Sequence, residues 1–153
     1  MKLNSSVIFV KDIDRACHFY EKVMCLKVEH DFGKNVIFEG GLAIWQLNSE
    51  HIIAQKLQTR SSSNRFELYF EDSNIEGVYN RLLEEGVEFL HPIKQEMWGQ
   101  KTIRFFDHDH HLIEIGEPLE IFVRNMYLEG LSIPEIVEKS GIVQNTVVKL
   151  LGV

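Results

Sequence analysis

The stretch DHDHHLIE, from Asp107 to Glu114, concentrates side chains that could do chemistry. Asp, His and Glu are residue types that bind metal ions such as zinc, so a metal site is one interpretation. Histidines converge on a metal when they stand at i and i+4 of a helix, whereas neighbouring histidines in a tight turn rarely do. Asp favours turns, and His is enriched at positive φ. We therefore expect His108, His110 and His111 to be solvated turn residues, and any chemistry of this stretch to belong to Glu114.

The 153-residue chain has an ordinary globular composition, with 44% hydrophobic and 25% charged residues. That length favours one domain, or one domain with a small appendage. The formal net charge of -7 argues against a nucleic-acid partner, because binding to phosphates needs clustered Lys and Arg. Cys17 and Cys25 form no CxxC pattern and fit reduced thiols. The chain has no long apolar run and no signal-peptide pattern, so we expect a cytoplasmic protein without a membrane partner.

Two sets of elements would position these residues, and both follow the same order. In each set a β-branched or aromatic run precedes an amphipathic helix and three further strand-like runs. Asp12 and Asn74 are typical helix N-caps, and Gly86 is a typical helix terminator. The expected strands are 7–10, 26–30, 35–39 and 42–47 in the first set, and 66–70, 87–90, 102–106 and 112–115 in the second.

The nearly equal spacing of the two sets predicts an internal duplication and an α+β fold. We expect one domain at 1–117, built from two tandem βαβββ units that form a cupped, barrel-like sheet. The units span about 3–48 and 65–117, with a polar linker at 49–64. Residues 118–153 have a helical pattern and should form a C-terminal helical tail.

Two such units, with VKDIDRACHFYEKVMCLKV in the first and FFDHDHHLIEIGE closing the second, resemble the vicinal oxygen chelate superfamily. That superfamily includes glyoxalases, extradiol dioxygenases, epimerases, fosfomycin-resistance proteins and bleomycin-binding proteins. In the family the last turn is usually Asp-Pro-Asp-Gly, and here His108 and His110 replace its Pro and Gly.

The resemblance implies where a metal or catalytic site would lie. Family members that use a metal place one ligand on the first strand and one on the last strand of each unit. The matching positions are Ser5, Trp45 or Gln46, Glu67 and Glu114. None of them is His, which disfavours a non-haem iron site, and we expect no tightly bound transition metal. If a metal binds at all, Glu67 and Glu114 are its expected ligands, and two carboxylates with water would hold it weakly.

Without a metal, two carboxylates in one cup can act as general acid and base, because like charges raise the pKa of one of them. We therefore expect Glu67 and Glu114 to be catalytic. The alternatives are a solvated strand-edge charge for Glu67 and a structural, hydrogen-bonded carboxylate for Glu114. Arg104 would meet an anionic substrate group, or pair with Glu67 or Glu71. The residues expected to bind substrate are Trp45, Gln46, Tyr69, Trp98, Gln100, Arg104 and Phe106.

These residues and the resemblance lead to three hypotheses. The first is a glyoxalase-like enzyme that performs lyase- or isomerase-type proton transfer on a small molecule. The alternative is a non-catalytic drug- or metabolite-binding protein of the bleomycin-resistance type, which aromatic residues such as Trp45 and Trp98 favour. The third is a DNA-binding sensor, because Ser132 to Leu151 resembles a helix-turn-helix. Acidic residues outnumber basic ones in the tail, so we expect a helical cap instead. By resemblance we also expect a homodimer.

Overall fold

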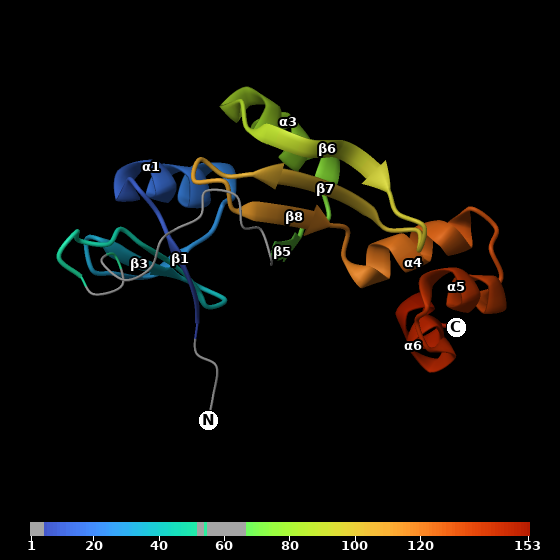
Figure 1. Cartoon of the computed structure of the whole chain (residues 1–153). Helices are drawn as coiled ribbons and strands as arrows, with labels where there is room; N and C mark the ends of the chain where they lie inside the picture. The colour runs from blue at the N-terminus through green and yellow to red at the C-terminus, as the bar shows by residue number, and fades with distance from the viewer. Residues whose placement is uncertain (1–4, 52–53, 55–66) are drawn as a thin grey trace. The chain divides into compact units, whose positions relative to one another are not determined.

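Two compact units divide the chain in the computed structural model, which describes residues 5–51, 54 and 67–153 (Figure 1). Unit 1 is Met1–Arg65 with Asp107–His110, and unit 2 is Phe66–Phe106 with His111–Val153. Most of the expected linker, the first residues of the first unit and the expected strand start at Phe66 lie outside the described residues. Each unit has one βαβββ set and its own four-stranded sheet, which confirms the α+β duplication; the described strands close no barrel.

Unit 1 carries a helix over one face of a mixed sheet. Its strand order is β1-β4-β3-β2, with β1 parallel to β4 and the other pairs antiparallel. The helix α1 continues as a short π-helical segment, η1. The elements are β1 (Ser6–Phe9), α1 (Ile13–His18), η1 (Phe19–Val23), β2 (Val28–Asp31), β3 (Asn35–Phe38) and β4 (Leu42–Trp45).

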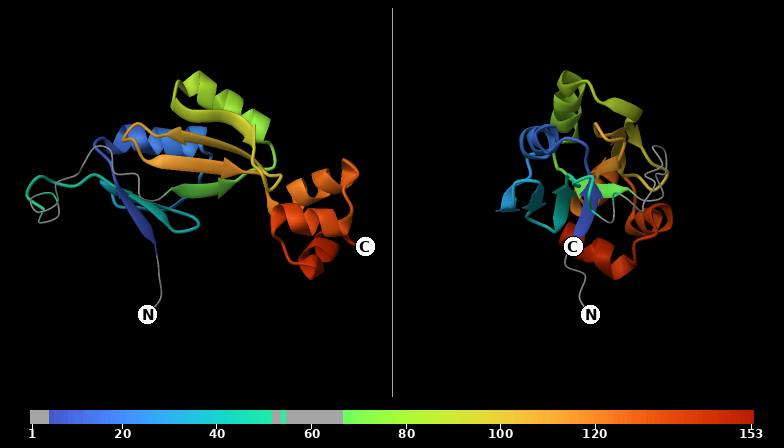
Figure 2. Two further views of the ribbon diagram at one scale, coloured as in Figure 1. Left: turned by 45° about the vertical axis from the view of Figure 1, so that its right-hand side comes forward. Right: turned by 60° about the vertical axis from the view of Figure 1, so that its left-hand side comes forward.

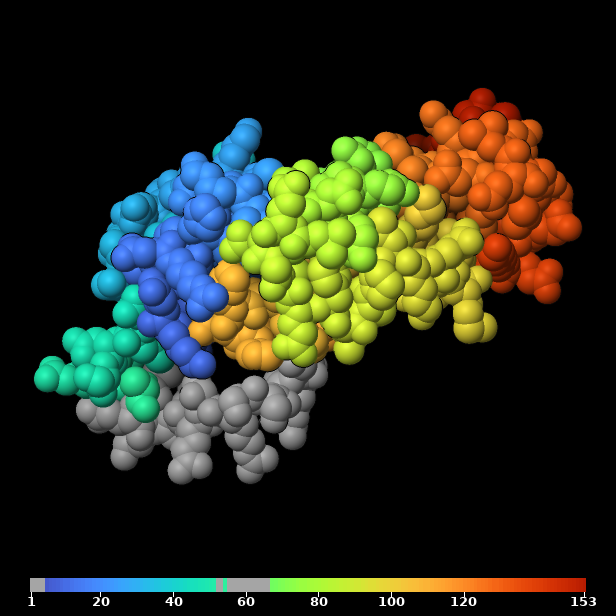
Figure 3. Space-filling view, turned by 90° about the horizontal axis from the view of Figure 1, so that it is seen from above, coloured from blue at the N-terminus to red at the C-terminus, as the bar shows by residue number. Residues whose placement is uncertain are grey.

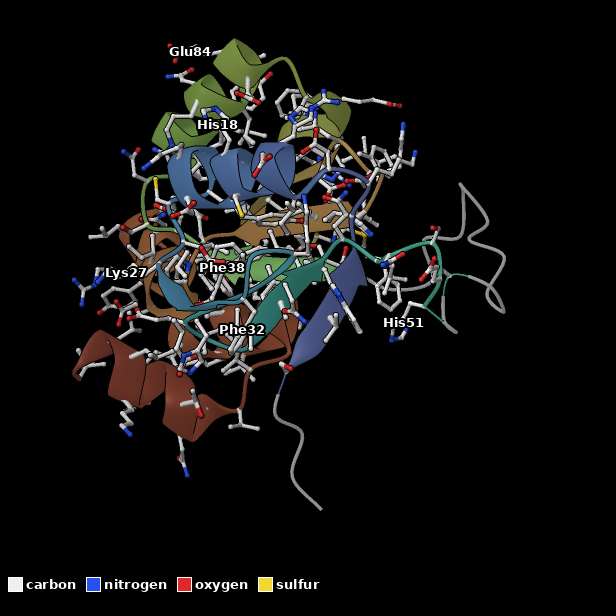
Figure 4. All side chains as sticks on the ribbon, turned by 90° about the vertical axis from the view of Figure 1, so that its left-hand side faces the viewer. His18, Lys27, Phe32, Phe38, His51 and Glu84 are labelled. Carbon is white, nitrogen blue, oxygen red and sulfur yellow. The ribbon has the colours of Figure 1, made fainter. Side chains whose placement is uncertain are left out.

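The core of unit 1 follows from strand alternation and a helix cap. Asp12 begins α1 as predicted, because its side chain accepts hydrogen bonds from the backbone N–H groups of Asp14 and Arg15. Alternate strand residues pack under the helix, and Phe38 lies there with its ring 5.9 Å from that of Tyr20 (Figure 4). The fully or nearly fully buried side chains include Ile8, Ile13, Phe19, Val36 and Ile44.

Unit 2 repeats this architecture with the strand order β5-β8-β7-β6. The strand β5 is parallel to β8, and the helix α3 packs on β6 and β7 (Figure 2). The elements are β5 (Leu68–Glu71), α3 (Ile75–Glu85), β6 (Glu88–Gln95), β7 (Lys101–Phe106) and β8 (Leu112–Gly116). Asn74 caps α3 by accepting a hydrogen bond from the N–H of Gly77, and Gly86 ends it in the left-handed region, as predicted.

The face of the unit 2 sheet under α3 is apolar. Tyr79 of α3 contacts Phe89 at 5.1 Å between ring centroids, and Phe89 contacts Phe105 at 6.3 Å. Ile103 and Ile113 are fully buried. Because side chains alternate along a strand, the residues between these point to the opposite face of the sheet. That opposite face carries the polar residues discussed below.

The stretch Asp107 to His110 forms a tight turn. The N–H of His110 donates to the carbonyl of Asp107 at 3.0 Å, and His110 has a positive φ of 63°. The carboxylate of Asp107 accepts from the N–H of Asp109 and, at 2.8 Å, from the buried hydroxyl of Tyr20. The turn therefore forms with His in place of Gly, and its first Asp ties it to η1 within unit 1.

The C-terminal tail of unit 2 is helical, as expected. It consists of α4 (Leu119–Leu128), α5 (Ile133–Ser140) and α6 (Gln144–Leu151). Ser132 and Glu135 form a capping box at α5, and Gly141 ends that helix in the left-handed region. Figure 3 shows the orange-to-red atoms of the tail beside the yellow atoms of the β6–β7 hairpin of the same unit. The three helices share a core of Phe122, Val123, Met126, Ile136 and Val147.

Across the described part of the chain, no helix combines the length and the apolar character needed to cross a membrane.

Candidate functional site

One transverse row of polar side chains crosses the open face of the unit 2 sheet. The strand register places Tyr69 opposite Glu114, Glu114 opposite Arg104, and Arg104 opposite His91. Residues that are neighbours in register project to the same face of a sheet. All four side chains therefore lie on the face away from α3.

Arg104 is the centre of this row. Its Nε pairs with Glu67 Oε2 at 3.2 Å, its Nη1 with Glu96 Oε1 at 2.8 Å, and its Nη2 with Glu114 Oε2. Nη1 also lies 3.2 Å from Nε2 of His91. Three carboxylates thus share one guanidinium: Glu67 is one of the alternative partners that the sequence suggested, and Glu96 and Glu114 are two partners that were not expected.

Glu114 is a buried carboxyl group whose pKa is raised. The side chain belongs to β8 and is 4% exposed. Burial raises its pKa, Arg104 opposes that shift, and the nearby carboxylate of Glu67 adds to it, with a net increase. Glu67 and Glu114 are thus brought together beside Arg104, as the prediction of an acid–base pair requires.

Glu96 is also buried, but its pKa has the opposite shift. Burial raises its pKa, yet Arg104, Lys94 and the Thr102 hydroxyl together lower it below the ordinary value. Lys94 Nζ lies 3.1 Å from one carboxylate oxygen, and Thr102 Oγ1 donates to the other at 3.1 Å. The site therefore holds one carboxyl that favours its proton beside one that favours ionisation, an arrangement that separates acid from base roles.

A second group of polar residues adjoins the row at the β6–β7 loop. Trp98 Nε1 donates to Gln100 Oε1 at 3.0 Å, and Gln100 Nε2 donates to the Tyr69 hydroxyl at 2.9 Å. That hydroxyl lies 3.1 Å from Glu71 Oε1, to which it donates. Burial and Glu71 raise the pKa of Tyr69, although the Gln100 contact lowers it. Glu71, an alternative partner for Arg104, is thus engaged by Tyr69.

Gly116 allows this group to form. A Cβ atom at that position would lie 2.5 Å from Gln100 Nε2 and 2.9 Å from the Tyr69 hydroxyl. No side chain fits there without moving both partners. The structure therefore brings together Tyr69, Trp98 and Gln100, three of the residues expected to bind substrate.

The remaining expected residues have other surroundings. Phe106 ends β7 in register with Leu112 and Glu88, on the same face as Arg104. Trp45 belongs to unit 1, where its ring contacts those of Phe9 at 6.1 Å and His51 at 5.0 Å.

Gln46, also in unit 1, has a local structural role. Its Oε1 accepts hydrogen bonds from the backbone N–H of Ile13, at 2.9 Å, and from Lys34 Nζ, at 3.3 Å. The side chain therefore helps to fix the start of α1. A part for Gln46 or Trp45 in substrate binding stays a prediction.

The strand register corrects one expected correspondence between the units. Val7 pairs with Ala43 in unit 1 just as Tyr69 pairs with Glu114 in unit 2. Ala43, and not Trp45 or Gln46, is therefore the counterpart of Glu114. Trp45 lies two residues further along β4, opposite Phe9, and is therefore on the same face as Ala43.

Sequence reasoning missed Glu96 and His91. Both lie on the β6 side of the hairpin, where Pro92 and two register irregularities obscure the alternation of side chains. The run HPIKQEMWG looks like a solvated strand end and loop. One available signal was Arg104 itself, since a partly buried Arg among alternating apolar residues needs carboxylate partners.

The residues present do not fit a bound metal. Across residues 5–51, 54 and 67–153, no three His, Cys, Asp or Glu side chains are grouped so that they could hold a metal ion. The unit 1 counterpart of Glu114 is Ala43, which has no donor atom. In unit 2 the guanidinium of Arg104 already lies among the carboxylates, and its charge repels a second cation.

Duplicated βαβββ units, each with one helix over a mixed four-stranded sheet, define the vicinal oxygen chelate class of proteins. Within that class the family model described as glyoxalase-like domain matches residues 3–120, so the chain belongs to the glyoxalase-like family.

Individual relatives support the same assignment. The chain is 30% identical over 115 residues to the metallothiol transferase FosB of Shouchella clausii, covering 74% of this chain and 77% of that protein. A solved structure of a protein of unknown function from Agrobacterium tumefaciens is 36% identical, with a TM-score of 0.70 over 78% of this chain and 95% of that chain.

A more distant neighbour agrees in fold. The fosfomycin resistance protein FosX of Listeria monocytogenes is 21% identical, with a TM-score of 0.57 over 76% of this chain and 93% of that chain. At this identity the likeness shows a shared fold and carries no conclusion about activity.

Proposed function

We propose that this glyoxalase-like protein is an enzyme that performs lyase- or isomerase-type proton transfer on a small molecule, with Glu114 as the acid–base residue. The observation that carries the proposal is the buried carboxyl of Glu114, whose pKa is raised while it lies between Arg104 and Glu67. A raised carboxyl pKa suits proton exchange with a weakly acidic carbon near neutral pH.

The chemistry needs only groups of this chain. Ionised Glu114 removes a proton from a carbon next to a carbonyl, and the electron pair of the C–H bond moves to the carbonyl oxygen as an enolate. Return of the proton to a neighbouring carbon gives an isomerase. Expulsion of a group from the β-carbon gives a lyase. Glu67 is a direct neighbour of Glu114, so its carboxylate can accept a hydrogen bond from the protonated Glu114 carboxyl.

The name of the FosB relative, a metallothiol transferase, suggests a different reaction. We place proton transfer first because the donor set of this chain does not fit a metal ion. The absence of histidine at Ser5, Ala43, Glu67 and Glu114 leaves two carboxylates, and both are paired with Arg104.

A second candidate function is binding of a drug or metabolite without turnover. It is favoured by aromatic side chains on the open faces of the two sheets. In unit 1 the rings of Phe9, Trp45 and His51 contact one another in series. In unit 2 Tyr69 is 48% and Trp98 is 38% exposed, so both offer ring surface to a ligand.

Carboxylate-to-amide variants separate the two functions. A ligand would first be found by thermal-shift screening of a small-molecule library, and its affinity and conversion would then be measured. Glu67→Gln and Glu114→Gln keep shape and hydrogen bonding but remove the base. An enzyme should keep its ligand affinity and lose turnover by about 100-fold to 10,000-fold. Glu84→Gln, on the outer face of α3 (Figure 4), is the control and should behave like the wild type.

Two outcomes contradict the enzyme proposal. Turnover of Glu114→Gln at the wild-type rate shows that Glu114 is not the base. The second outcome is that no ligand found in the screen is converted to product and that only Trp45→Ala and Trp98→Ala weaken ligand binding. In that case the aromatic surface carries the affinity, and the binding-protein function takes first place.

A further inference from the structure

The cluster around Arg104 draws its carboxylates from three separate segments. Glu67 precedes β5, Glu96 follows β6, and Glu114 lies within β8, while Arg104 lies on β7 between them. Each carboxylate reaches a different nitrogen of the guanidinium. The three carboxylates therefore surround the guanidinium of Arg104 as ligands surround a bound cation.

Arg104 balances most of the negative charge of this cluster. Among the residues that the structure describes, Lys94 also contacts the cluster, but its side chain is 56% exposed, and its ion pair is with Glu96. In the described residues, the ion pairs of Glu67 and Glu114 are both with Arg104. Removal of this one cation would leave two neighbouring carboxyl groups, one of them buried, without an opposite charge.

The guanidinium also keeps N–H donors available. Arginine has five N–H groups, one on Nε and two on each terminal nitrogen. Nε–H faces Glu67, and Nη1 has Glu96 and His91 within reach. Nη2 forms an ion pair with Glu114 Oε2, but this contact lacks hydrogen-bond geometry, so among the described residues Nη2 keeps N–H groups for a ligand. These donors lie on the same nitrogen as the contact to the proposed base.

We infer that the guanidinium of Arg104 is the permanent cation of this site, in the place where a divalent metal would have to bind, and that an Nη2 N–H binds the substrate oxygen that becomes negative. The role in chemistry rests on the proposed function, whereas the exclusion of metal does not. An arginine stays ionised at every working pH, so the site needs no metal to balance its carboxylates. The substrate class is then a carbonyl compound whose enolate oxygen is bound by a fixed guanidinium.

Divalent-cation titration tests the inference without any substrate. Chelator-treated protein is titrated with MnCl₂, NiCl₂ and ZnCl₂, by calorimetry and by thermal unfolding. The wild type should show no stoichiometric binding at micromolar concentrations. Arg104→Ala leaves the carboxylates of Glu67 and Glu114 without their cation and should bind at least about 10-fold tighter, with a higher unfolding midpoint in metal. Arg104→Lys keeps a cation and should resemble the wild type.

Arg124→Ala, on the exposed face of α4, is the matched control for loss of an arginine and should gain no metal binding. If Arg104→Ala fails to fold, metal titration of the wild type and of Arg104→Lys still tests the inference. Micromolar, stoichiometric metal on the wild type that is lost in Glu114→Ala overturns the inference. So does metal binding that is equal in folded Arg104→Ala and the wild type, or stoichiometric metal on Arg104→Lys.

Failure of the inference and failure of the proposed function can be told apart. Loss of turnover in Glu114→Gln reports the base and does not depend on which cation is present. Metal titration reports the cation and does not depend on turnover. With a substrate in hand, Arg104→Lys should lower kcat more than it raises KM, because the contact to the enolate oxygen forms only in the transition state.

Discussion

At the residue scale, Glu96 and Glu114 are two buried carboxyl groups that the same arginine treats differently. Burial raises the pKa of Glu96, but Arg104, Lys94 and Thr102 lower it more, so its pKa falls. Burial and the charge of Glu67 raise the pKa of Glu114, Arg104 lowers it, and the net result is a raised pKa. The balance of partners, and not burial by itself, decides which carboxyl is suited to hold a proton.

The opposite shifts predict opposite pH dependences of stability. A raised pKa in the folded state means that folded Glu114 binds more protons than the unfolded chain, so its contribution to the free energy of unfolding falls as pH rises from the unfolded to the folded pKa. A lowered pKa gives Glu96 a contribution that is present above the unfolded pKa and is lost as pH falls through the folded one. Urea unfolding from about pH 3 to about pH 8 spans both windows.

Glu114→Gln and Glu96→Gln isolate the two contributions. The free energy of unfolding of Glu114→Gln, relative to that of the wild type, should increase as pH rises, because the variant escapes the cost of ionising a buried group. The free energy of unfolding of Glu96→Gln, relative to that of the wild type, should decrease as pH rises, because the wild type gains its ion pairs. The same slope for both variants would show that the two carboxyl groups do not differ in environment.

The sequence showed part of this site and missed the rest for a physical reason. The resemblance and the closing motif pointed to Glu67 and Glu114, since a short regular strand keeps its side chains in phase. Glu96 could not be found this way. Its position depends on a bulged hairpin, and a bulge changes which side chain faces the sheet without leaving a periodic signal.

At the scale of elements, the β6–β7 loop is held by the first helix of the tail. Gly99 has a φ of 101°, and a Cβ at that position would lie 2.6 Å from Met126 Sδ of α4. The loop also carries Trp98 and Gln100, whose hydrogen bonds reach Tyr69. The tail therefore supports the loop that borders the candidate site.

Gly99→Ala should destabilise the protein and disturb this loop. The backbone conformation alone costs about 1–3 kcal/mol for a residue with a Cβ. The approach to Met126 adds to that cost. Gly130→Ala is the control, because Gly130 has a similar φ of 97° but no atom within 4 Å of its Cβ position. Chemical denaturation compares the two free energies of unfolding; equal losses would mean that the Met126 contact is unimportant.

Element boundaries were predictable where a local signal exists. Asp12, Asn74 and Ser132 cap helices, and Gly86 and Gly141 end them, because each acts through the adjoining backbone. The strand β6 was expected to end at residue 90 but continues to Gln95 through Pro92. Its extension depends on pairing with β7, a contact that the local sequence does not encode.

At the scale of the whole molecule, duplication has produced two sheets with different open faces. Val7 and Ala43 in unit 1 are the register counterparts of Tyr69 and Glu114 in unit 2. One unit therefore carries small and apolar side chains at the positions where the other carries a hydroxyl and a carboxylate. The candidate chemistry is concentrated in unit 2, because the same backbone there holds charged residues.

The last prediction concerns the tail, whose α5 and α6 are joined through Gly141 as in a helix-turn-helix. We expect no DNA binding. The tail residues Glu120, Glu129, Glu135 and Glu138 outnumber Arg124, Lys139 and Lys149, and the chain carries a net charge of -7, so phosphate approach is unfavourable. A gel-shift assay with random duplex at low salt should show no complex.

A matched variant shows whether charge is the reason. Replacing Glu120, Glu129 and Glu138 together by Lys keeps the apolar core of the tail and reverses its charge, so it should create binding that weakens steeply as salt rises. Lys149→Glu should leave the wild-type result unchanged. Salt-sensitive binding by the wild type that disappears in Lys149→Glu would instead make α6 a DNA-contacting helix, because only a phosphate contact at that position loses its attraction when the charge is reversed.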